Sequence, residues 1–441
     1  MRKASAQLRR RLTVTAGSVP LVLGMAAGIG PAGTASVAAA AVGMTPAVGV
    51  HPQAVRASDS VVNGKVIFSC QQRSTTFPCY GPQQIRRAYN ITNLIKSGIK
   101  GQGRSIVIID AFSSPTLRQD FKVFNSTFGL PSSNLRVIAP QGMVPFNKND
   151  PNMVGWSAEI SLDVEYAHAV APAATITLVL ARTNQDQDIL NATKYAVDNN
   201  LGDVISQSFG EAEQCSGVPL SAEHAVFQEA TNKGMTIFAS SGDDGAAQPA
   251  CNGNGVIQSV STPASDPLVT GVGGTRLYAD PPTGQYQHEV AWNDQYGASG
   301  GGFSTVYGVP SYQQGLNLPK RGVPDVAYNA DVYGGVLVAW GVPNGVGAFY
   351  IFGGTSAGSP QWAGIAALTD QLAGHRIGFI NPAIYSILHS GNYSMAFHDI
   401  TSGNNRVKGV FGYTTARGWD PVTGVGTPMA SALAHMLAFN N

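Results

Sequence analysis

The regular alternation of apolar, strand-like runs with helical segments from Ser105 onward is the feature that most constrains the fold of this chain. Short apolar runs bounded by turn residues are typical of buried strands, and connections long enough to hold a helix are what parallel strands require. The sequence therefore predicts an α/β fold in which a parallel sheet carries helices on both faces. The expected strands span residues 105–110, 175–181, 203–208, 235–240 and 267–273, and the expected helices span residues 156–170, 186–199 and 221–233.

The first 40 residues have the pattern of a secretory signal peptide. They hold five basic residues and no acidic one, and an uncharged run rich in Ala, Val, Leu and Gly follows the basic part. Pro20 and Pro31 interrupt any helix long enough to span a bilayer, which disfavours a membrane anchor. We therefore expect residues 1–40 to be removed and the protein to be secreted. Residues 41–63 are interpreted as a short leader or linker, and residues 64–441 as one large domain.

The charge of the chain gives no sign of a nucleic-acid partner. Without the five basic residues of the signal segment, 22 basic residues stand against 26 acidic ones, so the net charge becomes −4. A nucleic-acid-binding domain carries a basic stripe or patch, and none remains here.

The four cysteines fit an exported protein, in which disulfides persist. Cys70 and Cys79 are close in sequence, and Cys215 and Cys251 bracket a Gly-rich region, so we favour these two bridges among the three possible pairings. A zinc site is the alternative. It is disfavoured because spacings of 9 and 36 residues match no common zinc finger.

Gly354-Thr355-Ser356-Ala357-Gly358 places one serine in a glycine-flanked bend before an apolar helical segment. Small neighbours allow a sharp turn and the close approach of a substrate, and a helix N-terminus favours developing negative charge. The motif is typical of an exposed nucleophile. It fits the nucleophile elbow of α/β-hydrolases and the bend of subtilisin-like peptidases equally well, and ordinary Gly-Ser turns also contain it.

The histidine that usually activates such a serine is missing. In subtilisin-type enzymes an Asp ends the first strand, as Asp110 does here, and His-Gly-Thr opens the next helix; none of the eight histidines precedes Gly-Thr. That helix carries Glu159 and Asp163 instead, which lie four residues apart and therefore on one face. Close carboxyls share a proton, which suits general acid-base work. A solvated acidic face is the ordinary alternative, although the helix is otherwise nearly uncharged.

A third acidic residue, Asp243, follows the strand expected at residues 235–240. Ligands bind at the carboxyl ends of parallel strands, and a protonated carboxyl there can donate a hydrogen bond to an oxyanion. The alternative is an Asp-Gly turn formed with Asp244.

Taken together, these motifs resemble the sedolisins, or serine-carboxyl peptidases, including the kumamolisins. The resemblance covers about residues 80–441. It rests on the order of the motifs IVIID (106–110), Glu159 with Leu162-Asp163, Ala171-Pro172, SSGDDG (240–245), PASDP (263–267), VGGT (272–275), Gly300-Gly301-Gly302-Phe303-Ser304, VPDVA (323–327), GGTSAGSP (353–360) and GWDPVTGVGTP (418–428).

The resemblance implies a subtilisin-like fold and a secreted, monomeric endopeptidase that cleaves protein or peptide substrates in acid. It assigns Ser356 as the nucleophile, Glu159 as its general base, Asp163 as the residue that orients Glu159, and Asp243 as the oxyanion donor. Ser356 would form an acyl-enzyme that water hydrolyses. Extended substrates would pair with the backbone of residues 208–210 and 300–302.

The resemblance also implies one structural calcium ion near the C-terminus. The matching ligands are the side chains of Asp399 and Asp420 and the carbonyls of Ile400, Ala416 and Gly418. Hard oxygen ligands suit Ca²⁺. Ala416 stands where glycine is common in the family, and an Asx-turn loop without metal is the alternative.

The chain departs from the family in its leader. Sedolisins typically carry a long folded propeptide, whereas only about 20–40 residues separate the expected signal cleavage from Cys70. We therefore expect no long propeptide. Two other functions remain open: a secreted pseudopeptidase that binds peptides without cleaving them, and an α/β-hydrolase esterase, which lacks an upstream oxyanion loop here.

Overall fold

The computed structural model describes residues 48–49, 53–62, 65–407 and 409–439. The expected signal peptide, residues 1–40, lies outside these described residues. Within them, no helix is both long enough and apolar enough to cross a membrane.

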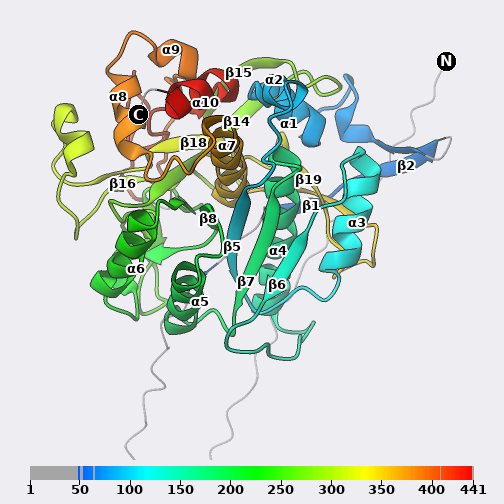
Figure 1. Cartoon of the computed structure of the whole chain (residues 1–441), viewed down its shortest axis with the longest axis horizontal. Coiled ribbons are helices and arrows are strands. Elements are labelled where there is room, and N and C mark those ends of the chain that lie inside the picture. Colours follow the sequence, from blue (N-terminus) through cyan, green and yellow to red (C-terminus); the bar gives the residue numbers. More distant parts are fainter. Residues whose placement is uncertain (1–47, 50–52, 63–64, 408, 440–441) are drawn as a thin grey trace, which may run out of the picture. The chain divides into compact units, whose positions relative to one another are not determined.

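The centre of the fold is an eight-stranded sheet (Figure 1). Its order is β15 (Tyr286–Ala291), β14 (Thr270–Ala279), β10 (Thr236–Ser240), β8 (Val204–Gln207), β5 (Ser105–Ala111), β7 (Thr175–Ala181) and β6 (Leu135–Ile138), with β18 (Val326–Asn329) also paired to β14. All neighbours are parallel except β15, which pairs antiparallel with β14. The predicted parallel sheet is confirmed, and β6, β15 and β18 are strands that the sequence pattern did not predict.

Helices cover both faces of this sheet, as predicted. Strand side chains alternate between faces, and on β5 Ile106 and Ile108 enter one hydrophobic core whereas Val107 and Ile109 enter another. The first core also contains α4 (Pro151–Val170) and α7 (Gly358–Ala373), and the second contains α5 (Asp186–Asp198) and α6 (Leu220–Asn232).

Helix α4 begins five residues earlier than predicted. Asp150 caps it by accepting hydrogen bonds from the backbone N–H groups of Asn152 and Met153, and Pro151 occupies the first turn, where a missing N–H costs nothing. Every residue from Trp156 to Val170 is buried, so α4 is a core helix without a solvent face. The solvated acidic face considered for Glu159 and Asp163 is therefore excluded.

A second sheet of four strands contains part of the segment interpreted as a leader or linker. Its order is β1 (Gln53–Arg56), β20 (Phe349–Gly353), β19 (Gly335–Ala339) and β4 (Cys79–Tyr80). β1 pairs antiparallel with β20, with Gln53 opposite Gly353. The described residues of that segment are thus paired with the rest of the fold.

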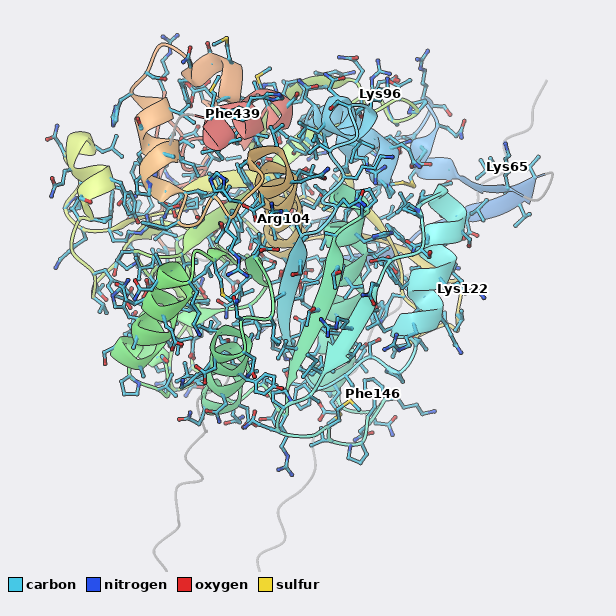
Figure 2. All side chains as sticks on the ribbon, viewed as in Figure 1. Lys65, Lys96, Arg104, Lys122, Phe146 and Phe439 are labelled. Atoms are coloured by element: carbon cyan, nitrogen blue, oxygen red, sulfur yellow. A yellow bond between two sulfur atoms is a disulfide. The ribbon has the colours of Figure 1, made fainter. Side chains whose placement is uncertain are left out.

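The remaining elements surround the two sheets. Lys65 on the β2–β3 hairpin and Lys122 on α3 carry their charges at the surface (Figure 2). The helices are α1 (Pro82–Ala88), α2 (Ile91–Lys96), α3 (Leu117–Phe128), α8 (Asn381–Leu388), α9 (Tyr393–Ala396) and α10 (Ala430–Phe439), with short 3₁₀ turns η1 (Ser69–Gln71), η2 (Glu213–Cys215), η3 (Ser311–Leu316) and η4 (Thr355–Ala357). The short strands are β2 (Asp59–Val62), β3 (Lys65–Phe68), β9 (Glu211–Ala212), β11 (Ala247–Pro249), β12 (Val256–Gln258), β13 (Ser261–Thr262), β16 (Gly302–Phe303), β17 (Gly322–Val323), β21 (Phe397–His398) and β22 (Thr427–Pro428).

Both favoured disulfides are present. Cys70 bonds to Cys79, and Cys215 bonds to Cys251. The second bridge ties η2, which follows β8 and β9, to the loop between β11 and β12.

A buried ion pair predicts a large loss of stability when it is broken. Arg321 and Asp325 are both fully buried and form a bidentate ion pair. Asp325 also accepts a hydrogen bond from the Gly271 backbone. Arg321→Met leaves the Asp325 charge buried without a cation, so the free energy of unfolding should fall by about 3–5 kcal/mol, measured by denaturant titration. The matched control Lys194→Met breaks the exposed pair with Asp198 and should leave the free energy of unfolding nearly unchanged. Equal effects would contradict the prediction.

Candidate active site

The candidate residues gather at one edge of the central sheet. β5, β8 and β10 run parallel, so the residues that end or follow them lie at the same edge: Asp110, Ser208 and Asp243. Ser356 comes to this edge from the second sheet, in the 3₁₀ turn between β20 and α7, where it contacts Ser208.

Ser356 sits in a bend that requires glycine before it. Gly354 has a φ of 106°, and a Cβ there would lie 2.6 Å from Asp243 Oδ2. Ser356 is 6% exposed, and its hydroxyl donates to the carbonyl of Ser208 at 3.2 Å, while the Ser208 hydroxyl donates to the Ser356 carbonyl at 3.3 Å. Helix α7 begins two residues later, which places the positive end of its dipole beside the serine.

Glu159 and Asp163 are fully buried beside Ser356. Burial raises the pKa of Glu159 well above its ordinary value, the neighbouring Asp163 and Asp110 raise it further, and contact with the Ser356 hydroxyl lowers it. Burial also raises the pKa of Asp163, to about 8, while contacts with Ser208 and Glu159 act in the opposite direction. Two carboxyls in one dry site therefore hold at least one proton between them through acid and neutral pH.

Asp110 is a third member of this carboxyl cluster, and our sequence reasoning gave it no role. Its side chain is fully buried, and its pKa is raised well above the ordinary value by burial and then by Asp163. The available signal was its position at the end of β5, next to the strand that leads to Ser208. A one-dimensional sequence does not say that this end faces α4.

Asp243 contacts the residue that precedes Ser356 in the bend. Its Oδ1 accepts hydrogen bonds from the backbone N–H of Thr355 at 2.8 Å and from the Thr355 hydroxyl at 2.7 Å. The Thr355 hydroxyl in turn accepts from the Gly242 backbone at 3.2 Å. These contacts fix Asp243 one residue from the nucleophile candidate, half-buried at the edge of a cavity.

The cavity has a volume of about 400 Å³, and Ser356, Asp243 and the Cys215–Cys251 bridge contribute to its wall. Residues 208–210 line it, as expected for a strand that pairs with substrate. Residues 300–302 are absent from its wall. A Cβ on Gly300 would lie 2.1 Å from the Ser241 carbonyl, so this glycine run packs behind the loop that holds Asp243 rather than facing the cavity.

Hydrogen bonds link four of the five expected calcium-ligand residues in two pairs. Asp399 Oδ1 accepts from the Gly418 backbone at 3.1 Å, and Asp420 Oδ2 accepts from the Ala416 backbone at 3.0 Å. Both carboxyls raise the pKa of Tyr393, after the larger effect of burial, because both lie near its hydroxyl. Within the described ranges, no group of three or more His, Cys, Asp or Glu side chains could hold a metal. The expected site uses two side chains, with backbone carbonyls for the rest.

The buried cluster predicts how stability changes with pH. Asp163 binds its proton more tightly in the folded protein, with a pKa of about 8, than in the unfolded chain, where a free Asp has a pKa of about 3.9. Between these values the folded state holds more protons, so rising pH destabilises it, by up to about 1.4 kcal/mol per pH unit for one group.

We expect Asp163→Asn to make the free energy of unfolding less dependent on pH between about pH 4 and pH 8. Denaturant titrations across this range measure the slope, with Asp198→Asn, an exposed carboxyl, as the control. A slope in Asp163→Asn equal to that of the wild type would show that Asp163 does not hold the proton.

Several known proteins are similar to this chain in sequence. The subtilase family model matches residues 141–383. Kumamolisin from Bacillus sp. (strain MN-32) is 32% identical over 388 residues, which cover 84% of this chain and 66% of the relative. Sedolisin from Pseudomonas sp. (strain 101) is 32% identical over 327 residues, which cover 70% of this chain and 53% of the relative.

A solved structure confirms the subtilisin-like fold. The structure of Pseudomonas sedolisin, a serine-carboxyl proteinase, in complex with two molecules of pseudo-iodotyrostatin matches with a TM-score of 0.73 and 29% identity, over 83% of this chain and 100% of that chain. The chain spans between about half and two thirds of the length of the curated relatives named above. The chain belongs to the subtilase family of serine peptidases and, within it, to the sedolisins.

Proposed function

We propose that this protein is a secreted serine-carboxyl endopeptidase that hydrolyses peptide bonds in acid, with residues 64–441 as its catalytic domain. The observation that carries the proposal is the position of Ser356 beside the buried pair Glu159 and Asp163, in a cavity whose described wall contains no histidine. Membership of the sedolisins supports the peptidase activity. Secretion rests on the signal pattern of residues 1–40.

The proposed reaction uses Glu159 as the general base. The Ser356 hydroxyl turns from the Ser208 carbonyl toward Glu159, which takes its proton as the serine oxygen attacks the peptide carbonyl. Glu159 then returns the proton to the amine as the bond between carbon and nitrogen breaks. The amine leaves, and the acyl group stays on Ser356 as the acyl-enzyme. Water, activated by the same carboxylate, hydrolyses the ester and releases Ser356.

The carboxyl cluster keeps the number of charges in the site low. Its members ionise in successive steps, because each new charge is opposed by those already present. The first ionisation supplies the single carboxylate that serves as base, and the later ones lie at higher pH. Asp163 and Asp110 hold the remaining protons and orient Glu159.

Asp243 is proposed as the oxyanion donor. Its contacts with Thr355 place it against the bend that carries Ser356. A carboxyl donates a hydrogen bond only while protonated, so this role also confines activity to acid.

The decisive experiment incubates the full chain with denatured protein at about pH 3–4, where a carboxylate base works and an imidazole would be protonated. We expect cleavage by the wild type and none by Ser356→Ala. Asp243→Ala removes the donor, so it should retain binding but lose about 10²–10³-fold in kcat, the effect of one oxyanion donor. Cleavage is measured by the appearance of new amino termini.

The controls separate the competing functions. Folded wild type that binds peptides but cleaves nothing would favour a pseudopeptidase. Cleavage by Ser356→Ala equal to that of the wild type would remove Ser356 from the mechanism. A rate that stays constant through neutral pH would contradict the role of Asp243.

We further propose one structural calcium ion, held by Asp399 and Asp420 with the carbonyls of Ile400, Ala416 and Gly418. The donors fit a hard cation, since all five are oxygens, and both carboxyls accept hydrogen bonds from the backbone of residues 416–418. Bound calcium would offset the repulsion between these carboxyls and fix the loop.

Removal of calcium should therefore lower the melting temperature. An ion present at about 100 times its Kd contributes about 2.7 kcal/mol to stability. Thermal unfolding with a chelator, with added Ca²⁺ and with added Mg²⁺ measures the effect. We expect Asp399→Asn to lose most of the response to Ca²⁺, and an identical melting temperature with and without Ca²⁺ would contradict the site.

A further inference from the structure

A second carboxyl pair lies behind the wall of the substrate cavity. Glu211 begins β9 directly after Gly210, the last residue of the 208–210 segment, and lines the cavity. It also lines a smaller pocket on the other side of this segment, together with Asp186 at the start of α5 and Glu223 on α6. The 208–212 segment therefore separates the cavity from a buried acidic cluster.

Asp186 and Glu211 form a contact that needs a proton. Asp186 is 4% exposed, its Oδ2 accepts from the Gly217 backbone, and its Oδ1 is buried without a donor. Glu211 lines the same pocket, and each of the two carboxyls changes the pKa of the other. Two carboxylates repel, whereas a carboxyl and a carboxylate share a strong hydrogen bond, so protonated Glu211 supplies the donor that Oδ1 lacks.

The surroundings of this pair favour retention of the proton. Burial, followed by the charges of Asp186 and Glu223, raises the pKa of Glu211 to about 8. On α6, Glu223 accepts from the Thr262 hydroxyl, and burial raises its pKa to about 7.

Among the described residues, no ion pair includes Asp186 or Glu211. Of the ion pairs between described residues, the one at this cluster joins His224 to Asp266 at 2.8 Å, and Tyr307 also donates to Asp266. Asp266 adds negative charge near Glu223 and so also favours protonated carboxyls.

In the proposed function, the backbone of the same segment receives the extended peptide. Gly210 exchanges two hydrogen bonds with Gly49, at 3.3 and 3.4 Å, in an antiparallel bridge. Val48, next to Gly49, lies in the pocket beside Asp186 and Glu211. This edge is thus able to pair with an extended chain, and its position depends on what lies behind it.

We propose that Glu211 and Asp186 are positioning residues for substrate binding: one proton shared between them holds the 208–212 segment in the place where it pairs with the peptide. Loss of that proton leaves two buried charges in contact, and their repulsion displaces the segment. This inference rests on the proposed peptidase function for its substrate, and it is independent of the Glu159 cluster. Neither residue belongs to the Glu159 cluster, and the effect is measured as peptide affinity in a protein that does not cleave, apart from kcat.

The test compares peptide affinity with pH in a non-cleaving background. A fluorescent extended peptide is titrated into Ser356→Ala, and into the same protein with Glu211→Gln, from pH 4 to pH 8.5. The affinity of the Ser356→Ala protein should fall above the midpoint by up to about tenfold per pH unit, the limit for one linked proton. Glu211→Gln should flatten this fall, because its amide donates to Asp186 without titrating.

Two further variants sharpen the result. Asp186→Asn reverses the direction of the hydrogen bond and should flatten the profile in the same way. The matched control Glu223→Gln removes a carboxyl of the same pocket that already has a donor, Thr262. In Glu223→Gln the affinity should still fall as pH rises. The midpoint of this fall should move to lower pH, because the charge of Glu223, which raises the pKa of Glu211, is gone.

Hydrogen exchange gives a readout that does not depend on peptide binding. Amides of residues 204–212, corrected for intrinsic rates, should lose protection as pH rises in the wild type and keep it in Glu211→Gln. An unchanged pH profile in Glu211→Gln, or equal flattening by Glu223→Gln, overturns the proposal. If the folded protein binds no peptide at any pH, the proposed function fails, and hydrogen exchange still decides whether the shared proton positions the segment.

Discussion

The burial of carboxyl groups on α4 is the constraint on which the rest of the structure depends. A surface helix could carry Glu159 and Asp163 at little cost, but α4 has protein on every side. Isolated charges are expensive in such a place, so these groups keep protons and share them with Asp110. The same burial that disfavours a charge here raises the pKa of Glu159, so its carboxylate is a stronger base than a carboxylate in water. Stability and chemistry therefore depend on one set of protons.

The sequence predicted the parts of the fold that depend on local patterns. The strands at β5, β7, β8 and β10 and the helices α5 and α6 were found within a few residues, because apolar period and length are local properties. Glu159 and Asp163 were paired by helical spacing alone, and their proximity to Ser356 followed from the family resemblance. The structure brings all three together.

What the sequence missed depends on contacts between distant segments. Asp110 and Asp163 are 53 residues apart in the sequence. They come together only because β5 pairs in register with β8 and α4 packs against the sheet. The pair Asp186 and Glu211 is hidden for the same reason, since one opens a helix and the other a two-residue strand. The glycines at 300–302 were predicted to face the substrate, but they pack against protein backbone. A glycine run indicates that another group comes close, and the sequence does not tell whether that group is substrate or the chain itself.

The pairing of β1 with β20 has a practical meaning for handling the protein. β20 leads through Gly354 to Ser356, and β1 shields its outer edge. A recombinant form that starts after Arg56 would expose the backbone of β20 as an open edge, a template for aggregation, three residues from the nucleophile candidate. N-terminal tags and expression boundaries therefore belong upstream of Val48, where the strand and its neighbours stay whole.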